Sequence, residues 1–208
     1  MIHKRLFLLV LLLAAQACEL HPEPGIAKGE ELFEACSPCH GEAGVGNPDI
    51  EAPAIAGLPQ WYLEEQLNAF QRRWRGMHHA DLAGLRMRPM AETLNKDGDI
   101  VSVAEYVASL PPVQPPSTLG GDAGAGAERY ATVCATCHGE DGAGDEILHA
   151  PPLVNIDDWY LAGELRDYRD GARGADPDDV WGAQMRAQSI ALSDQAIRDV
   201  VAYIQTLR

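Results

Sequence analysis

Two short stretches decide the fold of this chain: Cys36-Ser-Pro-Cys39-His40 and Cys134-Ala-Thr-Cys137-His138. In each stretch, two cysteines are separated by two residues and a histidine follows directly. This spacing is the attachment motif of c-type haem, because each thiol can form a thioether with one haem vinyl group while the histidine reaches the iron. The sequence therefore predicts two covalently bound haem c groups. The expected thioether residues are Cys36, Cys39, Cys134 and Cys137, and the expected axial histidines are His40 and His138.

Three other uses of a cysteine pair explain less of the pattern. A thioredoxin-like redox pair needs a βαβ context, which this sequence does not show. A four-cysteine zinc site usually has a much shorter separation between its two pairs. A disulfide within each motif would close a very small, strained loop. None of these alternatives accounts for a histidine after both pairs.

The residues around the two motifs repeat at an offset of 98. Between segments 36–94 and 134–192, 20 of the 59 ungapped positions are identical, well above the level of unrelated segments. The shared features are Gly-x-Gly, Ala-Pro, Trp-Tyr-Leu, Arg-Gly and Met-Arg, in that order. After Leu94 the offset falls to 97. The chain is therefore a tandem duplication.

A stretch rich in proline and glycine separates the two copies. Prolines favour an extended backbone and the closing glycines favour a flexible end, so we expect a linker here. The expected organisation is a signal peptide over 1–17, an N-terminal tether over 18–27, a first domain over 28–111, a linker over 112–121 and a second domain over 122–208.

Apolar spacing predicts the same helices in both copies. A short helix is expected before each cysteine pair, over 28–35 and 127–133, and a second helix starts near Trp61 and Trp159. A third helix closes each copy, and in the second copy Ser193 is placed to cap it. No stretch alternates strongly enough to predict a strand. The expected fold class is all-α.

The N-terminus reads as an export signal. Lys4 and Arg5 precede an apolar run that is too short to span a bilayer comfortably. Cys18 follows the small-x-small stretch Ala15-Gln16-Ala17, which resembles a bacterial lipobox with Ala15 in place of the usual leucine. We therefore expect a periplasmic protein, anchored to the membrane through lipidated Cys18. A soluble exported protein with a free thiol is the alternative.

The charge balance bears on the class of partner. Without the signal, the chain has 14 basic and 31 acidic residues, a formal balance of −17. A protein this acidic is a poor candidate for binding nucleic acid. A redox partner with a basic docking face is plausible, although an acidic surface also serves solubility.

The order of these motifs resembles class I cytochromes c, and the tandem arrangement resembles diheme cytochromes of the cytochrome c4 type. The resemblance covers residues 25–208. It implies two tandem class I cytochrome c domains, each with a few helices around one haem. It also implies that a backbone carbonyl near Pro53 or Pro151 accepts the imidazole N–H of the axial histidine and so fixes the ring.

Class I cytochromes c use methionine as the sixth iron ligand. The second copy contains one methionine, Met185, and the first copy places Met87 at the aligned position. Met77 and Met90 align with other residue types. We therefore expect Met87 and Met185 to bind iron, with plain core packing as the alternative.

Side-chain chemistry suggests donors to the haem propionates. Arg75 and Arg173 are the better candidates, because a carboxylate favours a charged donor. Trp61 and Trp159 are further candidates. A solvated arginine and a core tryptophan remain open alternatives. The histidines outside the motifs are expected at the surface; they are His78, His79 and His149.

These features favour an electron carrier with two His/Met-ligated haems, no small-molecule substrate, and redox proteins such as a respiratory complex or a dehydrogenase as partners. A haem-bearing subunit of a periplasmic dehydrogenase or terminal oxidase complex is the alternative. A diheme peroxidase would need an open or displaceable ligand and a longer chain. A haem-based gas sensor would need a signalling domain.

Overall fold

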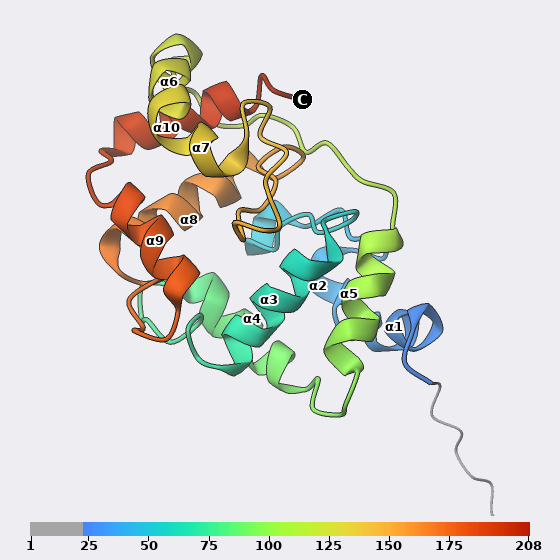
Figure 1. The fold of residues 1–208 in the computed structure, drawn as a ribbon. Coiled ribbons are helices and arrows are strands. Elements are labelled where there is room, and N and C mark those ends of the chain that lie inside the picture. Colours follow the sequence, from blue (N-terminus) through green and yellow to red (C-terminus); the bar gives the residue numbers. More distant parts are fainter. Residues whose placement is uncertain (1–22) are drawn as a thin grey trace, which may run out of the picture.

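The computed structural model describes residues 23–208, so the expected signal and Cys18 lie outside the described residues. The first copy forms α1 (Ile26–Phe33), α2 (Ser37–His40), η1 (Pro48–Ile50), α3 (Gln60–Gln71), α4 (Leu82–Glu92) and α5 (Asp99–Ser109). The second forms α6 (Ala123–Arg129), η2 (Tyr130–Cys134), α7 (Ala135–His138), α8 (Asp158–Asp170), α9 (Val180–Ser189) and α10 (Asp194–Ile204). Figure 1 shows the two copies side by side. Between residues 23 and 208, β-pairing is confined to two isolated bridges, so the prediction of an all-α fold is confirmed.

The first helix of each copy crosses the last helix at a glycine. A Cβ atom on Gly29 would lie 2.0 Å from the Ser102 carbonyl oxygen, and one on Gly126 would lie 1.9 Å from the Asp199 carbonyl oxygen. A side chain cannot fit in either place. Glycine therefore allows α1 to pack directly on α5, and α6 on α10.

A π-helical turn distinguishes the second copy from the first. Phe33 and Tyr130 are the buried aromatic residues beside the two crossings, each packed on a tyrosine of the last helix at ring-centroid distances of 5.4 and 5.3 Å. Phe33 lies three residues before Cys36, whereas Tyr130 lies four before Cys134. The π-helical turn η2 takes up this additional residue, as single π turns in helices commonly do. The helix expected over 127–133 therefore ends in π rather than α geometry.

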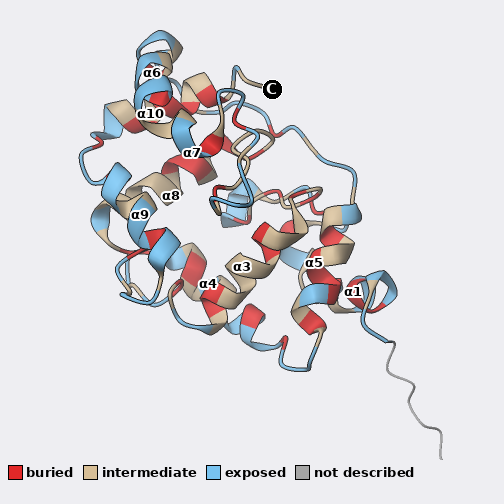
Figure 2. Cartoon of the chain, viewed as in Figure 1, coloured by how far each residue is buried: buried red, intermediate tan, exposed pale blue. Residues whose placement is uncertain are grey.

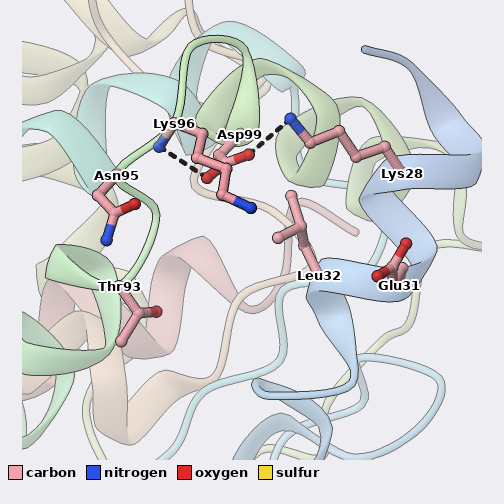
Figure 3. Close-up of a pocket in the computed structure, with 7 residues that line it drawn as sticks. All are labelled: Lys28, Glu31, Leu32, Thr93, Asn95, Lys96 and Asp99. Atoms are coloured by element: carbon pink, nitrogen blue, oxygen red, sulfur yellow. Dashed lines mark hydrogen bonds and ion pairs between the residues drawn. The ribbon is translucent and has the colours of Figure 1, made fainter. Parts of the chain in front are cut away.

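A buried ion pair links α1 to the start of α5 (Figure 3). Lys28 Nζ lies 2.7 Å from Asp99 Oδ1, and the Lys96 backbone N–H donates to Asp99 Oδ2 at 2.9 Å. Burial alone would raise the pKa of Asp99, but these hydrogen bonds hold it below its usual value. The pair borders a small hollow of about 150 Å³.

The segments that contain the aligned methionines form helices α4 and α9, which the sequence periodicity did not identify. Asp81 and Asp179 are their N-caps, and each side chain accepts the backbone N–H three residues ahead, at 2.6 and 2.9 Å. Met87 and Met185 therefore lie in capped helices rather than in loops. The predicted cap Ser193 is confirmed at α10, where its hydroxyl accepts the Ala196 N–H at 3.1 Å.

The proline- and glycine-rich segment is held against the second copy. Asp158 Oδ2 accepts the Leu119 N–H at 2.6 Å, and Asp158 Oδ1 accepts the Thr118 hydroxyl at 2.8 Å. A Cβ atom on Gly121 would lie 2.4 Å from the Arg198 carbonyl oxygen. Residues 111–122 form neither helix nor strand, and the glycine end is packed on α10 rather than free.

Both copies contribute to one continuous apolar core. Buried side chains of α3 and α5 belong to the same cluster as those of α8 and α10, and Figure 2 shows buried positions on each of these helices. A buried hydrogen bond crosses between the copies, from the Ala54 N–H to Asp157 Oδ2 at 2.8 Å. Within residues 23–208, no helix combines the length and apolar character needed to cross a bilayer.

Candidate functional site

A cavity of about 580 Å³ lies in the first copy and brings together the residues predicted to hold its haem. Cys36, Cys39, His40 and Met87 all line this cavity; the first three belong to α2 and its N-cap, and Met87 belongs to α4. The rest of the wall is largely apolar and includes Leu58, Leu63, Phe70, Val103 and Val107. Haem is a flat apolar ring with iron at its centre, so apolar walls with one imidazole and one thioether fit it.

Each predicted axial histidine is held by the carbonyl that the resemblance implied. His40 Nδ1 lies 2.8 Å from the Pro53 carbonyl oxygen, and His138 Nδ1 lies 2.9 Å from that of Pro151. Burial lowers the pKa of both histidines, and these hydrogen bonds only partly oppose that effect. Each ring is therefore neutral near pH 7, with an Nδ1–H donor and an Nε2 lone pair available to iron.

The loop that presents this carbonyl depends on one glycine in each copy. Gly46 and Gly144 have φ values of +82° and +78°, in the region that favours glycine. A Cβ atom on Gly46 would lie 2.5 Å from the Ala54 nitrogen. The Gly46 N–H also donates to the His40 carbonyl oxygen at 2.8 Å. The Gly-x-Gly motif therefore shapes the loop behind the histidine.

The cysteines have the properties of attachment residues rather than of a redox pair. No disulfide joins the cysteines of either motif. Burial, with a smaller effect of Cys39, raises the pKa of Cys36 to about 11, and burial raises that of Cys134 to about 11. A thioredoxin-like pair needs a lowered thiol pKa. Across the described residues, no three His, Cys, Asp or Glu side chains are placed to share a metal ion.

Two methionines of the first copy line the cavity, Met87 and Met90. Met90 is 38% exposed and Met77, which does not line the cavity, is 51% exposed. Met87 is half-buried, as is Met185 at the aligned position of α9. The choice of Met87 over Met90 stays a prediction from the repeat.

Arg75 and Arg173 are both buried where the two copies meet, and each contacts the copy to which it does not belong. Arg75 Nη2 lies 2.7 Å from Glu164 Oε1, and Arg173 Nη1 is paired with Glu164 Oε2. Gln66 Oε1 accepts from Arg75 Nη1 at 2.8 Å and from Arg173 Nη2 at 3.0 Å. Two guanidinium groups therefore share one carboxylate and one amide.

Sequence analysis did not identify Glu164 and Gln66. A usable signal was present: they are aligned at the offset of 98, and each lies four residues after a tyrosine of the Trp-Tyr-Leu motif. In a helix that spacing places both side chains on one face. The face of α3 and of α8 that carries these residues was therefore predictable from the sequence. The contact between the two faces was not.

The propionate contacts stay predictions. The Nε atoms of Arg75 and Arg173 are buried and have no hydrogen-bond partner, which leaves one donor on each arginine for an acidic group such as a propionate. Trp159 Nε1 donates to Asp157 Oδ1 at 3.2 Å, so this indole N–H already has a partner. Trp61 is half-buried and packs edge-on against Tyr62.

His149 is not the simple surface residue that the sequence predicted. Its Nδ1 is hydrogen-bonded to Glu65 of the first copy, and its ring stacks on Trp181 with centroids 4.4 Å apart. His149 therefore lies at the contact between the copies. His78 and His79 are half-buried and exposed, respectively, and are absent from the cavity wall.

The second copy completes the cavity of the first. Residues of α8 line the cavity beside those of α3 and α4; they are Trp159, Tyr160, Gly163, Glu164, Arg166 and Asp167. The site for the first prosthetic group is therefore built from both copies.

The comparisons agree with this arrangement. The family model described as Cytochrome c matches residues 26–111 and again residues 123–208. The chain is 32% identical over 155 residues to a protein of Thiomonas intermedia named thiosulfate dehydrogenase electron acceptor, covering 69% of this chain and 66% of that protein. It is 31% identical over 194 residues to a protein of Azorhizobium caulinodans named cbb3-type cytochrome c oxidase subunit FixP, covering 87% and 59%.

Among solved structures, the reduced recombinant cytochrome c4 from Pseudomonas stutzeri is similar with a TM-score of 0.66 and 26% identity. The match covers 89% of this chain and 100% of that chain. The Thiomonas and Azorhizobium relatives are longer, and the chain spans about two thirds or less of their length.

Proposed function

Because the chain belongs to the cytochrome c family and is a diheme, cytochrome c4-like electron carrier, we propose that it passes electrons between exported or membrane-bound redox proteins through two haems, each ligated by one histidine and one methionine. The supporting observation is that His40 and Met87 line the same cavity as Cys36 and Cys39. Bound haem c supplies one-electron chemistry at its iron.

The side chains around this cavity have separable tasks. Cys36 and Cys39 provide the two thioethers, and Cys134 and Cys137 do so in the second domain. The Pro53 carbonyl fixes the His40 ring, so that Nε2 stays aligned as a ligand. The apolar wall excludes water, which stabilises the less charged, reduced state of the site. With one histidine and one methionine bound, each iron would offer a substrate no free coordination position.

The test is a spectroscopic redox titration of the purified holoprotein, followed by addition of carbon monoxide to the reduced form. We expect about two covalently bound haems per chain, two one-electron steps, and spectra that barely change with carbon monoxide. Rapid carbon monoxide binding at one haem, or peroxidase turnover with an added reductant, would contradict the proposal and favour an enzyme.

A second candidate is a haem-bearing subunit of a periplasmic dehydrogenase or terminal oxidase complex. The names of the Thiomonas and Azorhizobium relatives favour it, because one is called an electron acceptor of a dehydrogenase and the other an oxidase subunit. Purification of the tagged chain from its own cells in mild detergent distinguishes the two. A free carrier purifies alone, whereas a subunit brings an equimolar polypeptide with dehydrogenase or oxidase activity.

We also propose that the protein works in the periplasm and is anchored there through Cys18. The proposal is supported by the export signal and the position of Cys18 directly after it. One acyl chain anchors weakly, so such an anchor needs several chains. Cys18→Ser should move the protein from the membrane to the soluble periplasmic fraction. If Cys18→Ser has the same distribution as the wild type, Cys18 is not the anchor, and the alternative of a soluble exported carrier is favoured.

A further inference from the structure

We propose that the second domain carries a docking surface for a redox protein with a basic contact face. The surface is centred on four exposed apolar side chains, here called the second-domain apolar patch: Ile147, Leu148, Val180 and Trp181. This inference rests on the proposed carrier function and adds the site and the class of partner.

The patch is made from two segments that the structure holds together. Ile147 and Leu148 are 86% and 43% exposed, and Val180 and Trp181 are 56% and 42% exposed. His149 follows the first segment, and its ring stacks on that of Trp181 at 4.4 Å and an interplanar angle of 16°. The two segments therefore form one apolar surface, of the kind that marks an interaction site on a soluble protein.

The repeat places this patch at the mouth of the second prosthetic-group site. The first-domain counterparts of Leu148, Val180 and Trp181 are Ile50, Leu82 and Ala83, and all three line the first-domain cavity. Ile50 and Leu82 are also exposed, so they lie at its opening. The second-domain apolar patch therefore surrounds the equivalent opening, where a docked protein comes nearest to the site.

The two openings differ in charge and in shape. In the first domain, Arg86 Nη2 and Glu51 Oε2 form an exposed ion pair of 2.9 Å beside the opening. The aligned residues of the second domain are Gln184 and His149, and Trp181 replaces a small alanine. The opening of the second domain thus presents a larger apolar surface without that ion pair. Tryptophan is among the side chains that most often dominate the binding energy of an interface.

The charges around the patch identify the partner. Segments 140–149 and 175–185 contain seven acidic residues and no lysine or arginine. They are Glu140, Asp141, Asp145, Glu146, Asp176, Asp178 and Asp179. None of the seven forms an ion pair within the described residues. An apolar centre flanked along the chain by acids that form no ion pair attracts a partner whose apolar centre is flanked by lysine and arginine, and it repels a second copy of itself.

A charge-reversal experiment tests the acidic ring. The probe is oxidised mitochondrial cytochrome c, a lysine-rich redox protein, mixed with the reduced holoprotein in a stopped-flow instrument. Glu146→Lys with Asp178→Lys should lower the second-order rate constant about tenfold at low ionic strength. Both side chains are exposed and neither takes part in a described hydrogen bond, so the fold should be unaffected.

The matched control makes the same charge change on the first domain. Glu42→Lys with Asp49→Lys replaces two exposed acids of the corresponding loop, and it should alter the rate less than about twofold. Equal losses in both double variants would mean that net charge alone governs the reaction, and the proposal would be overturned.

The apolar centre is tested separately with Trp181. Trp181→Ala should lower the rate about tenfold at high as well as low ionic strength, because the lost contact is apolar. Trp181→Phe keeps a ring to stack on His149 and should restore most of the rate. An unaltered rate in Trp181→Ala would contradict the proposed centre. Reduction by ascorbate and reoxidation by ferricyanide should stay normal in every variant; their loss would indicate a failure of the carrier function rather than of docking.

Discussion

Met87 and Met90 lie three residues apart on α4, and both line the first-domain cavity, so the cavity alone does not select the distal ligand. The repeat does, since only Met87 aligns with Met185. We expect Met87→Ala or Met185→Ala to remove about half of the weak sulfur-to-iron absorbance of the oxidised protein, because each domain contributes one such bond. Met90→Ala is the matched control and should leave the absorbance intact. Loss of half the band in Met90→Ala would show that the repeat fails in this helix.

The local structure at Gly46 depends on the absence of a Cβ atom. Its φ of +82° and the 2.5 Å approach to the Ala54 nitrogen leave no room for a Cβ atom. Gly46→Ala should therefore lower the free energy of unfolding of the holoprotein by about 2 kcal/mol. Gly120→Ala is the control, because no atom lies within 4 Å of its added Cβ and its φ lies outside the region that favours glycine. Denaturant unfolding of both variants checks the prediction, and equal stabilities would contradict it.

Among the helices, periodicity predicted the elements with a continuous apolar stripe but not those built around a prosthetic group. The last helix of each copy follows such a stripe, and α10 starts at the predicted cap. Helices α4 and α9 contain a buried alanine or serine rather than a row of large apolar residues, and part of the inner face of α4 lies at the cavity. The π turn η2 was also hidden, because the sequence shows one additional residue but not where the backbone absorbs it.

The contact of α1 with α5 gives a prediction that depends on pH. Lys28→Met removes the partner of buried Asp99 and should lower the free energy of unfolding by about 3 kcal/mol near pH 7. The folded protein holds the pKa of Asp99 below its usual value. The ion pair therefore stabilises the fold fully above the ordinary aspartate pKa of about 4. This stabilisation is lost as the pH falls through the lowered pKa of Asp99 in the folded protein. The difference between wild type and variant should therefore shrink on acidification.

Unfolding curves between neutral and acidic pH measure that difference. Lys96→Met is the control, because Lys96 binds Asp99 through its backbone N–H and its side chain is exposed. Its effect should stay within about 0.5 kcal/mol at every pH. A Lys28→Met difference that grows on acidification would contradict the assignment of the ion pair.

Across the whole molecule, the duplication, the all-α fold and the two haem c groups followed from the sequence, whereas the contact between the domains did not. The motifs repeat along the chain, but a repeat does not state which faces of the copies meet. Residues such as Glu65 and His149 have different partners from their aligned counterparts, so the asymmetry of the contact is visible only in three dimensions. The same is true of α8, which closes the cavity of the other domain.

The central charge network of the contact between the domains can be tested by exchanging two of its side chains. Arg75 and Arg173 share Glu164, and Glu164→Gln would leave two buried guanidinium groups facing each other with amides only. The loss should be about 3 kcal/mol in the free energy of unfolding, because a buried charge without its partner is costly.

Gln66 already accepts hydrogen bonds from both arginines, at 2.8 and 3.0 Å, and it is the counterpart of Glu164 in the repeat. The double variant Gln66→Glu with Glu164→Gln therefore moves the carboxylate to the other domain and should recover most of the stability. Denaturant unfolding of the three holoproteins measures this. A double variant no more stable than Glu164→Gln would mean that the two positions are not equivalent toward the arginines.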